Sequence, residues 1–123
     1  MASGVVLLID TSREEALVAL ARGESALAER RWQQVPRTGR QVLEGIQALL
    51  GEQGLSLADI DRMAVHTGPG RWQAALRAGV TVANVLAYAA EAELVLVSGS
   101  DLGSMIREAM TAAPVAAVRV RYE

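Results

Sequence analysis

Two short stretches carry residue types that could do chemistry. Asp10 and Ser12 follow a run of apolar residues, and His66 stands just before a Gly-Pro-Gly turn. A carboxylate at the end of a strand can hold a metal ion, and a histidine can act as an acid or a base. Two-metal chemistry needs several converging carboxylates. Asp59 and Asp61 precede the strand that His66 ends, so we expect them at the opposite end of the sheet from Asp10.

The residues around Asp10 favour a structural role over a catalytic one. We expect its side chain to accept hydrogen bonds from backbone N–H groups of its own turn. No nucleophile elbow surrounds Ser12, and no glycine follows Asp10 as a phosphate loop would require. His66 is expected to be hydrogen-bonded at its turn. The alternative is a small hydrolase or nucleotide-binding enzyme that uses Asp10 and His66.

The turn at Gly68 and Gly70 precedes a long apolar segment, with Arg71 beside it. The N-terminus of a helix can bind an anion, so Gly68, Gly70 and Arg71 form a weak candidate anion site. The glycines lack the spacing of a dinucleotide-binding motif. A plain strand-to-helix turn is the favoured interpretation.

The composition excludes several classes of site. The 123 residues include no cysteine, no lysine and one histidine, and the formal net charge is -2. These absences remove thiol chemistry, Schiff-base lysines and multi-histidine metal sites, and we expect no cofactor and no metal. Direct nucleic-acid binding is not expected of an acidic chain. The basic group Arg30, Arg31, Arg37 and Arg40 is expected to be a solvated edge, with phosphate or a partner's carboxylates as the alternative.

No segment predicts export or membrane insertion. Residues 5–9 are too short for a signal peptide, and residues 72–90 carry Arg77 and Asn84. The expected location is the cytoplasm.

The hydrophobic pattern predicts alternating strands and helices. We expect strands at 5–9, 16–21, 25–32, 62–66, 93–98 and 115–122. We expect helices at 40–53, 56–59 and 71–90, and a last one capped by Ser100. Gly54 should end the first helix.

This order predicts an α/β domain with a ribonuclease-H-like fold. Three antiparallel strands are followed by αβ units in one mixed sheet, with the first strand parallel to the fourth. Residues 1–123 are expected to form a single domain.

The helix at 71–90 is apolar around most of its circumference. Its polar residues fall in an arc of roughly 80° at about 100° per residue. An ordinary surface helix buries one stripe only. We therefore expect the sheet to cover one side and a second protein to cover another.

The ordered motifs of the chain resemble the N-terminal half of the TsaB (YeaZ) family. The resemblance rests on residues 9–12, Gly23, 36–37, 50–55, 63–65, 68–70, 76–80 and 95–98. Residues 71–74 depart from the family's usual Ser-Phe-Thr-Gly. Residues 114–123 would be the start of a second half, where Arg119-Val120-Arg121 stands in place of an Asp-Ala-Arg signature.

The resemblance implies a non-catalytic subunit that supports threonylcarbamoyladenosine modification of tRNA by docking on the catalytic protein TsaD. It also implies a homodimer through a similar surface formed by the first two helices. The residues expected to bind the partner are Val42, Leu43, Ile46, Leu50, Trp72, Leu76, Val80, Ala83 and Ala87. A self-associating degenerate paralogue without a role in tRNA modification is the alternative.

Overall fold

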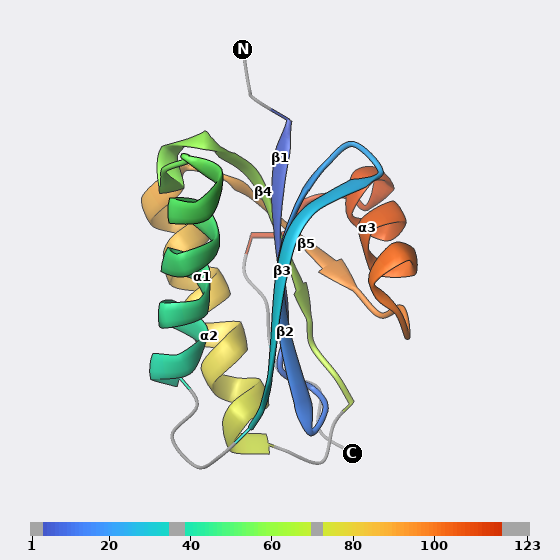
Figure 1. Ribbon diagram of the computed structural model, residues 1–123. Coiled ribbons are helices and arrows are strands. Elements are labelled where there is room, and N and C mark those ends of the chain that lie inside the picture. The colour runs from blue at the N-terminus through green and yellow to red at the C-terminus, as the bar shows by residue number, and fades with distance from the viewer. Residues whose placement is uncertain (1–3, 35–38, 70–72, 117–123) are drawn as a thin grey trace.

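The computed structural model describes residues 4–34, 39–69 and 73–116, which form one sheet with helices on both faces (Figure 1). The strands are β1 (Val5–Asp10), β2 (Glu15–Arg22), β3 (Ser25–Gln33), β4 (Ile60–His66) and β5 (Glu93–Val97). The helices are α1 (Gly39–Gln53), α2 (Gln73–Ala90) and α3 (Leu102–Thr111), with a short 3-10 helix, η1, at Leu57–Asp59.

The sheet has the predicted ribonuclease-H-like topology. Within the described residues its strand order is β3-β2-β1-β4-β5. The pairs β1–β2 and β2–β3 are antiparallel, and β1–β4 and β4–β5 are parallel. The predicted pairing of the first strand with the fourth is therefore confirmed. Because β1, β4 and β5 are parallel, their carboxyl ends meet at one edge of the sheet.

Helices cover the two faces of the sheet unequally. Figure 1 shows α1 and α2 side by side on one face and α3 alone on the other. Every residue of β1 is buried, because this central strand is covered on both faces. Leu7 and Ile9 belong to the core under α1 and α2, and Val6 and Leu8 to the core under α3.

The ends of the helices follow local sequence signals, with one correction. Gly54 takes a positive φ of 65° directly after α1, as a glycine helix stop requires. Ser100 does not cap α3. The N-cap is Asp101, whose carboxylate accepts a hydrogen bond from the Ser104 N–H at 2.8 Å.

Two other predictions fall partly outside the described residues. Most of the expected strand at 115–122 lies there, and Val115 itself forms an isolated antiparallel bridge with Leu94. The start of the second long helix is described only from Gln73. Within the described part of the chain, no helix is both long and apolar enough to span a bilayer.

Candidate functional site

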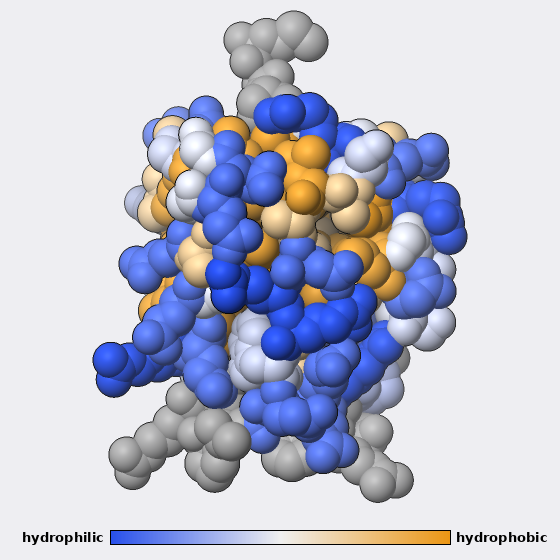
Figure 2. Space-filling view, in the orientation of Figure 1, coloured by the Kyte–Doolittle hydropathy of each residue, from blue (hydrophilic) through white to orange (hydrophobic). Residues whose placement is uncertain are grey.

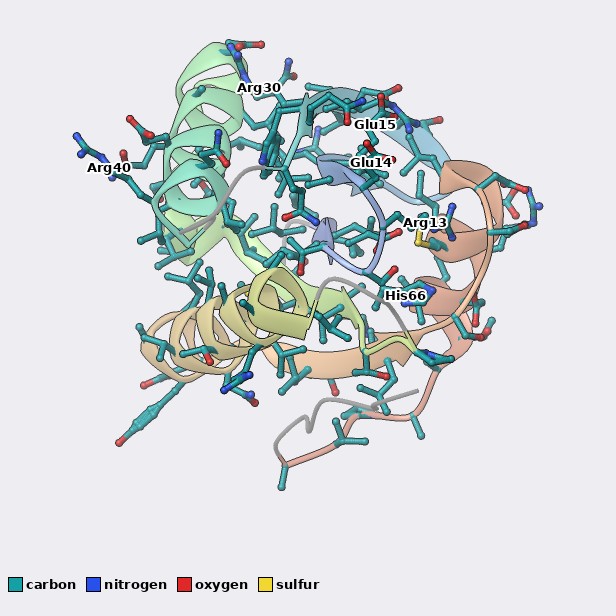
Figure 3. The ribbon with its side chains drawn as sticks, turned by 90° about the horizontal axis from the view of Figure 1, so that it is seen from below. Arg13, Glu14, Glu15, Arg30, Arg40 and His66 are labelled. Carbon is teal, nitrogen blue, oxygen red and sulfur yellow. The ribbon has the colours of Figure 1, made fainter. Side chains whose placement is uncertain are left out.

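The polar end of the sheet, where β1, β4 and β5 finish, holds the residues that could do chemistry (Figure 3). Asp10 is only 2% exposed. Its Oδ1 accepts hydrogen bonds from the Ser12 N–H at 2.9 Å and the Ser12 hydroxyl at 2.6 Å. Its Oδ2 lies 3.6 Å from Nε of Arg13. The carboxylate is thus occupied by its own turn, as predicted.

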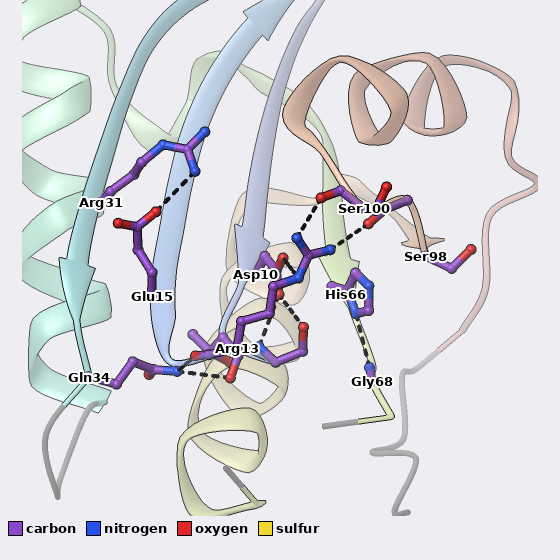
Figure 4. A network of polar contacts seen from close by, with 12 residues as sticks. Asp10, Arg13, Glu15, Arg31, Gln34, His66, Gly68, Ser98 and Ser100 are labelled. Carbon is purple, nitrogen blue, oxygen red and sulfur yellow. Dashed lines mark hydrogen bonds and ion pairs between the residues drawn. The ribbon is translucent and has the colours of Figure 1, made fainter. Parts of the chain in front are cut away.

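Arg13 ties this turn to the loop that follows β5 (Figure 4). Its guanidinium donates to the carbonyl oxygens of Gly99 at 2.8 Å and Ser100 at 2.5 Å. From the other side, the Gln34 amide donates to the carbonyl oxygens of Thr11 at 3.0 Å and Arg13 at 2.6 Å. The turn after β1 is therefore held at both flanks by side chains.

His66 is hydrogen-bonded at its turn, as predicted. It is buried, and its Nδ1 accepts a hydrogen bond from the Gly68 N–H at 3.1 Å (Figure 4). In the neutral ring this places the proton on Nε2. The Gly68 N–H is consequently engaged within the chain. The other two residues of the candidate anion site, Gly70 and Arg71, lie outside the described residues.

The carboxylates do not converge. Asp61 accepts hydrogen bonds from the N–H groups of Gly4 and Val5, at the opposite end of β1 from Asp10. In the described ranges, no three His, Cys, Asp or Glu side chains gather to hold a metal ion. A cavity beside Asp10 and Arg13 measures only about 70 Å³. Substrate pockets typically measure about 300–1,000 Å³, so this cavity is too small for one.

Helix α2 fills the space next to the turn after β1. A Cβ built on Gly79 would lie 2.2 Å from Oγ1 of Thr11, which is closer than atoms can approach. Gly79 therefore lets the helix backbone contact the turn directly. The buried Thr11 side chain packs against α2 at Gly79.

Two arginines of the basic group, Arg30 and Arg31, form close ion pairs within the chain. Arg30 pairs with Glu52. Arg31 pairs with Glu29 at 2.7 Å and Glu15 at 3.2 Å. The bond to Glu29 is the main cause that raises the pKa of Arg31 above its ordinary value. Figure 2 shows a hydrophilic surface over the lower part of this face, with a hydrophobic area above it.

Arg40 differs from these two arginines. It projects into solvent (Figure 3), and its nearest carboxylate is that of Glu44, at 3.9 Å. Arg37 lies outside the described residues.

Most of the predicted partner-binding residues are enclosed by the chain itself. They belong to the core between the two helices and the sheet: Val42, Ile46, Leu50, Leu76, Val80, Ala83 and Ala87. None of these seven is more than 8% exposed. They pack α1 and α2 against the sheet. Trp72 lies outside the described residues.

Leu43 is the one described member of the predicted set that faces outward, at 43% exposed. It lines a groove of about 460 Å³ between α1 and α2, which we call the outer groove. Its lining residues are Gly39, Leu43, Ala74, Arg77, Ala78, Thr81 and Val82. Val85, 59% exposed, and Tyr88, 78% exposed, continue the outward side of α2.

Sequence reasoning missed most of this outer groove, although a signal for it was present. The narrow polar arc of α2, with Arg77, Thr81 and Tyr88, marks the side of the helix that faces water. Apolar residues next to that arc, such as Ala78, Val82 and Val85, are therefore the ones that remain accessible on the outward side of α2.

Comparison with known proteins finds a matching family model and similar solved structures. A model of the TsaD family, tRNA N6-adenosine threonylcarbamoyltransferase, matches residues 37–118. A solved structure, YeaZ from Pseudomonas aeruginosa, is 30% identical with a TM-score of 0.69. A second structure from the same organism, described as similar to peptidase YeaZ, gives the same values. No curated protein matches the chain significantly.

The match to the Pseudomonas aeruginosa YeaZ covers 80% of this chain but only 44% of that protein. The chain therefore spans less than half the length of this relative. The RuvC structure from Thermus thermophilus is 13% identical with a TM-score of 0.51, and covers 76% of this chain and 63% of RuvC. That likeness concerns the fold alone.

Proposed function

The chain belongs to the TsaD family and is a TsaB (YeaZ)-like protein, and from this we propose that it is a non-catalytic subunit in threonylcarbamoyladenosine modification of tRNA. In this role it docks on a TsaD-like catalytic subunit through the outer groove. The observation that carries the proposal is the exposed apolar surface between α1 and α2. These are the two helices through which the resemblance implies docking.

The outer groove has the features of a helix-docking surface. Small residues at Ala74 and Ala78 let another backbone approach, and Leu43 and Val82 supply apolar contact at its walls. Val85 and Tyr88 extend this surface along α2. Tyrosine is enriched among residues that dominate binding energy, because its ring buries a large area while its hydroxyl stays hydrogen-bonded.

The polar end of the sheet supports the non-catalytic part of the proposal. Asp10 and His66 are engaged in local hydrogen bonds, and the cavity beside Asp10 is small. A catalytic acid or base must instead reach a bound substrate. In the proposed role, the subunit acts by binding and stabilising its partner.

Co-purification with the TsaD-like protein of the same organism tests the docking. Leu43→Asp places a charge in the outer groove and should weaken the complex by about tenfold or more, as loss of a central apolar contact does. Met110→Asp is the matched control, because Met110 is also 43% exposed but lies on α3, on the other face of the sheet.

The two variants separate the possible results. If Leu43→Asp and Met110→Asp retain the partner equally, the outer groove is not the docking surface. If the purified chain has no partner and doubles its mass through the outer groove, the self-associating paralogue is the better interpretation. Formation of the modified nucleoside by the catalytic subunit, with and without this chain, then tests the tRNA-modification role itself.

A further inference from the structure

The strand β3 forms one edge of the sheet. Within the described residues it pairs with β2 alone, and it stands at the front of the sheet in Figure 1. None of its nine residues is buried. The backbone N–H and C=O groups on its outer side are therefore available to another strand.

The hydrogen-bond pattern between β2 and β3 identifies these outward groups. The Gln34 N–H donates to the Glu14 carbonyl oxygen at 2.9 Å, and no register shift interrupts residues 28–33. Hydrogen-bonded pairs alternate with non-bonded pairs along antiparallel strands. Since Gln34 bonds toward β2, the odd-numbered residues of this stretch, Glu29 and Arg31 among them, direct their N–H and C=O groups outward.

The side chains at this edge carry charges of both signs in a fixed order. Glu29 and Arg31 lie on the face of the sheet that carries α3, because their cross-strand neighbours on β2 belong to the core on that face. Both are exposed, and an ion pair of 2.7 Å joins them. Arg30 lies on the opposite face, where it pairs with Glu52 of α1.

A second copy of β3 complements this order in one antiparallel register. With a twofold axis at Arg30, Glu29 stands opposite Arg31 of the second copy, and Arg31 stands opposite its Glu29. These are the residues whose backbone groups point outward, so the two strands can exchange hydrogen bonds there. Opposite charges on cross-strand neighbours attract. An axis at Glu29 or at Arg31 would instead place two like charges opposite one another.

The other face of the sheet accommodates the same register. The two copies of Arg30 meet at the axis, and each already has the carboxylate of Glu52 on its own α1. Trp32 lies opposite Ala28 of the second copy, whose side chain is small. A hollow of about 430 Å³ between β3 and α1, lined in part by Trp32, gives the side chains of the added strand room on this face.

We propose that the chain self-associates through the outer edges of two β3 strands, which joins the two sheets into one continuous sheet. The contact is distinct from the outer groove, whose lining residues lie on α1 and α2. One added strand pair is a small interface, so we expect a weak dimer with a Kd of roughly 10–1000 µM.

Charge exchange at two residues tests the proposal, with sedimentation velocity measured from about 5 µM to about 500 µM protein. Glu29→Arg and Arg31→Glu each place like charges opposite one another, and each should weaken the dimer by about tenfold. An equimolar mixture of the two variants again has opposite charges across the strand pair. The mixture should therefore dimerise as the wild type does.

Glu91→Arg and Arg107→Glu are the matched controls. They change the net charge by the same amounts, at exposed sites outside β3. Each should dimerise as the wild type does, both alone and in a mixture, and melting curves check that all four variants fold. If the exchanges in β3 leave the dimer unchanged, or if mixing them restores nothing, the inference is wrong.

Amide hydrogen exchange locates the contact on the chain. The N–H groups of Glu29 and Arg31 should exchange quickly in dilute protein and more slowly once the dimer forms. The Arg30 N–H, which bonds to β2, should be protected at both concentrations. A chain that stays monomeric throughout would overturn the inference. A dimer that Leu43→Asp dissolves and Glu29→Arg does not would also overturn it, because that dimer forms through the outer groove.

Discussion

Asp10 occupies a position that suits catalysis but is used to shape a turn. The carboxylate accepts two hydrogen bonds from Ser12 and lies near Arg13, which in turn holds the loop after β5. A buried carboxylate engaged in this way fixes the path of the chain between β1 and β2.

We expect Asp10→Ala to lower the free energy of unfolding by about 2–3 kcal/mol, because it leaves buried donors without an acceptor. Ser12→Ala removes one donor and keeps the carboxylate, and should cost about 1 kcal/mol. Urea denaturation of both variants measures the difference. An Asp10→Ala variant as stable as Ser12→Ala would show that the turn does not depend on this carboxylate.

Gly79 lets α2 approach Thr11 in the turn after β1 closely. We expect Gly79→Ala to destabilise the fold by about 1–3 kcal/mol, because the new Cβ overlaps the Thr11 side chain. Gly51→Ala is the control: Gly51 lies in α1 with no atom within 4 Å of a built Cβ. That change should stabilise α1 by up to about 1 kcal/mol.

The steric origin of the Gly79 effect is tested by adding Thr11→Ala. Removing Oγ1 and Cγ2 of Thr11 takes away the two closest atoms. The double variant should recover part of the stability lost in Gly79→Ala. If the double variant instead loses the sum of the stability losses of the two single variants, the destabilisation by Gly79→Ala does not come from its overlap with Thr11.

At the scale of elements, the sequence predicted the sheet well because its strands are apolar runs ended by turn residues. Residues 5–9 and 16–21 fall inside β1 and β2, and Gly54 ends α1 as expected. The cap of α3 was missed because Ser100 and Asp101 are adjacent and both suit an N-cap. The Ser100 carbonyl accepts from Arg13, a contact between distant parts of the chain that local sequence does not reveal.

The outward face of α2 was harder to predict for a different physical reason. Apolar residues surround most of this helix, so periodicity alone does not distinguish the core side from the exposed side. Packing against β4 and α1 selects Leu76 and Val80 for the core. Val85 and Tyr88 remain outside.

The Asp101 cap gives α3 a predictable pH dependence. The hydrogen bond from the Ser104 N–H lowers the pKa of Asp101 below its ordinary value. The charged cap therefore stabilises the fold above the unfolded pKa, and this contribution is lost as pH falls through the folded pKa. Asp101→Ala should have a lower melting temperature than the wild type at neutral pH. The difference between the two melting temperatures should become smaller at acidic pH.

Ser100→Ala is the control for this cap. Its backbone still offers the carbonyl that Arg13 uses, and its side chain does not cap the helix. Ser100→Ala should have the same melting temperature as the wild type at every pH. If Ser100→Ala lowers the melting temperature as much as Asp101→Ala does, Asp101 is not the residue that caps α3.

At the scale of the whole molecule, α1 and α2 each have an inner side that packs on the sheet and an outer side that is exposed. Their inner sides supply most of the core on one face of the sheet, and their outer sides form the outer groove. Substitutions on the two sides of one helix pair should therefore act on different equilibria. We expect inner residues to determine folding and, in the proposed role, outer residues to determine association.

Melting temperatures with and without the TsaD-like partner separate these equilibria. A partner at about a hundredfold above its Kd stabilises the folded chain by about 2.7 kcal/mol. Leu43→Asp, at an exposed site, should keep the melting temperature of the free chain and lose the shift that the partner causes.

For Leu76→Asp we expect the opposite result, a loss of stability in the free chain, because Leu76 is 0% exposed. Burying an unpaired carboxylate costs several kcal/mol, which is much of the stability of a small domain. This variant should unfold or melt far below the wild type before any partner is added. If Leu76→Asp instead folds normally and only loses the partner, α2 turns its Leu76 side outward in solution, and the division between core and docking surface is wrong.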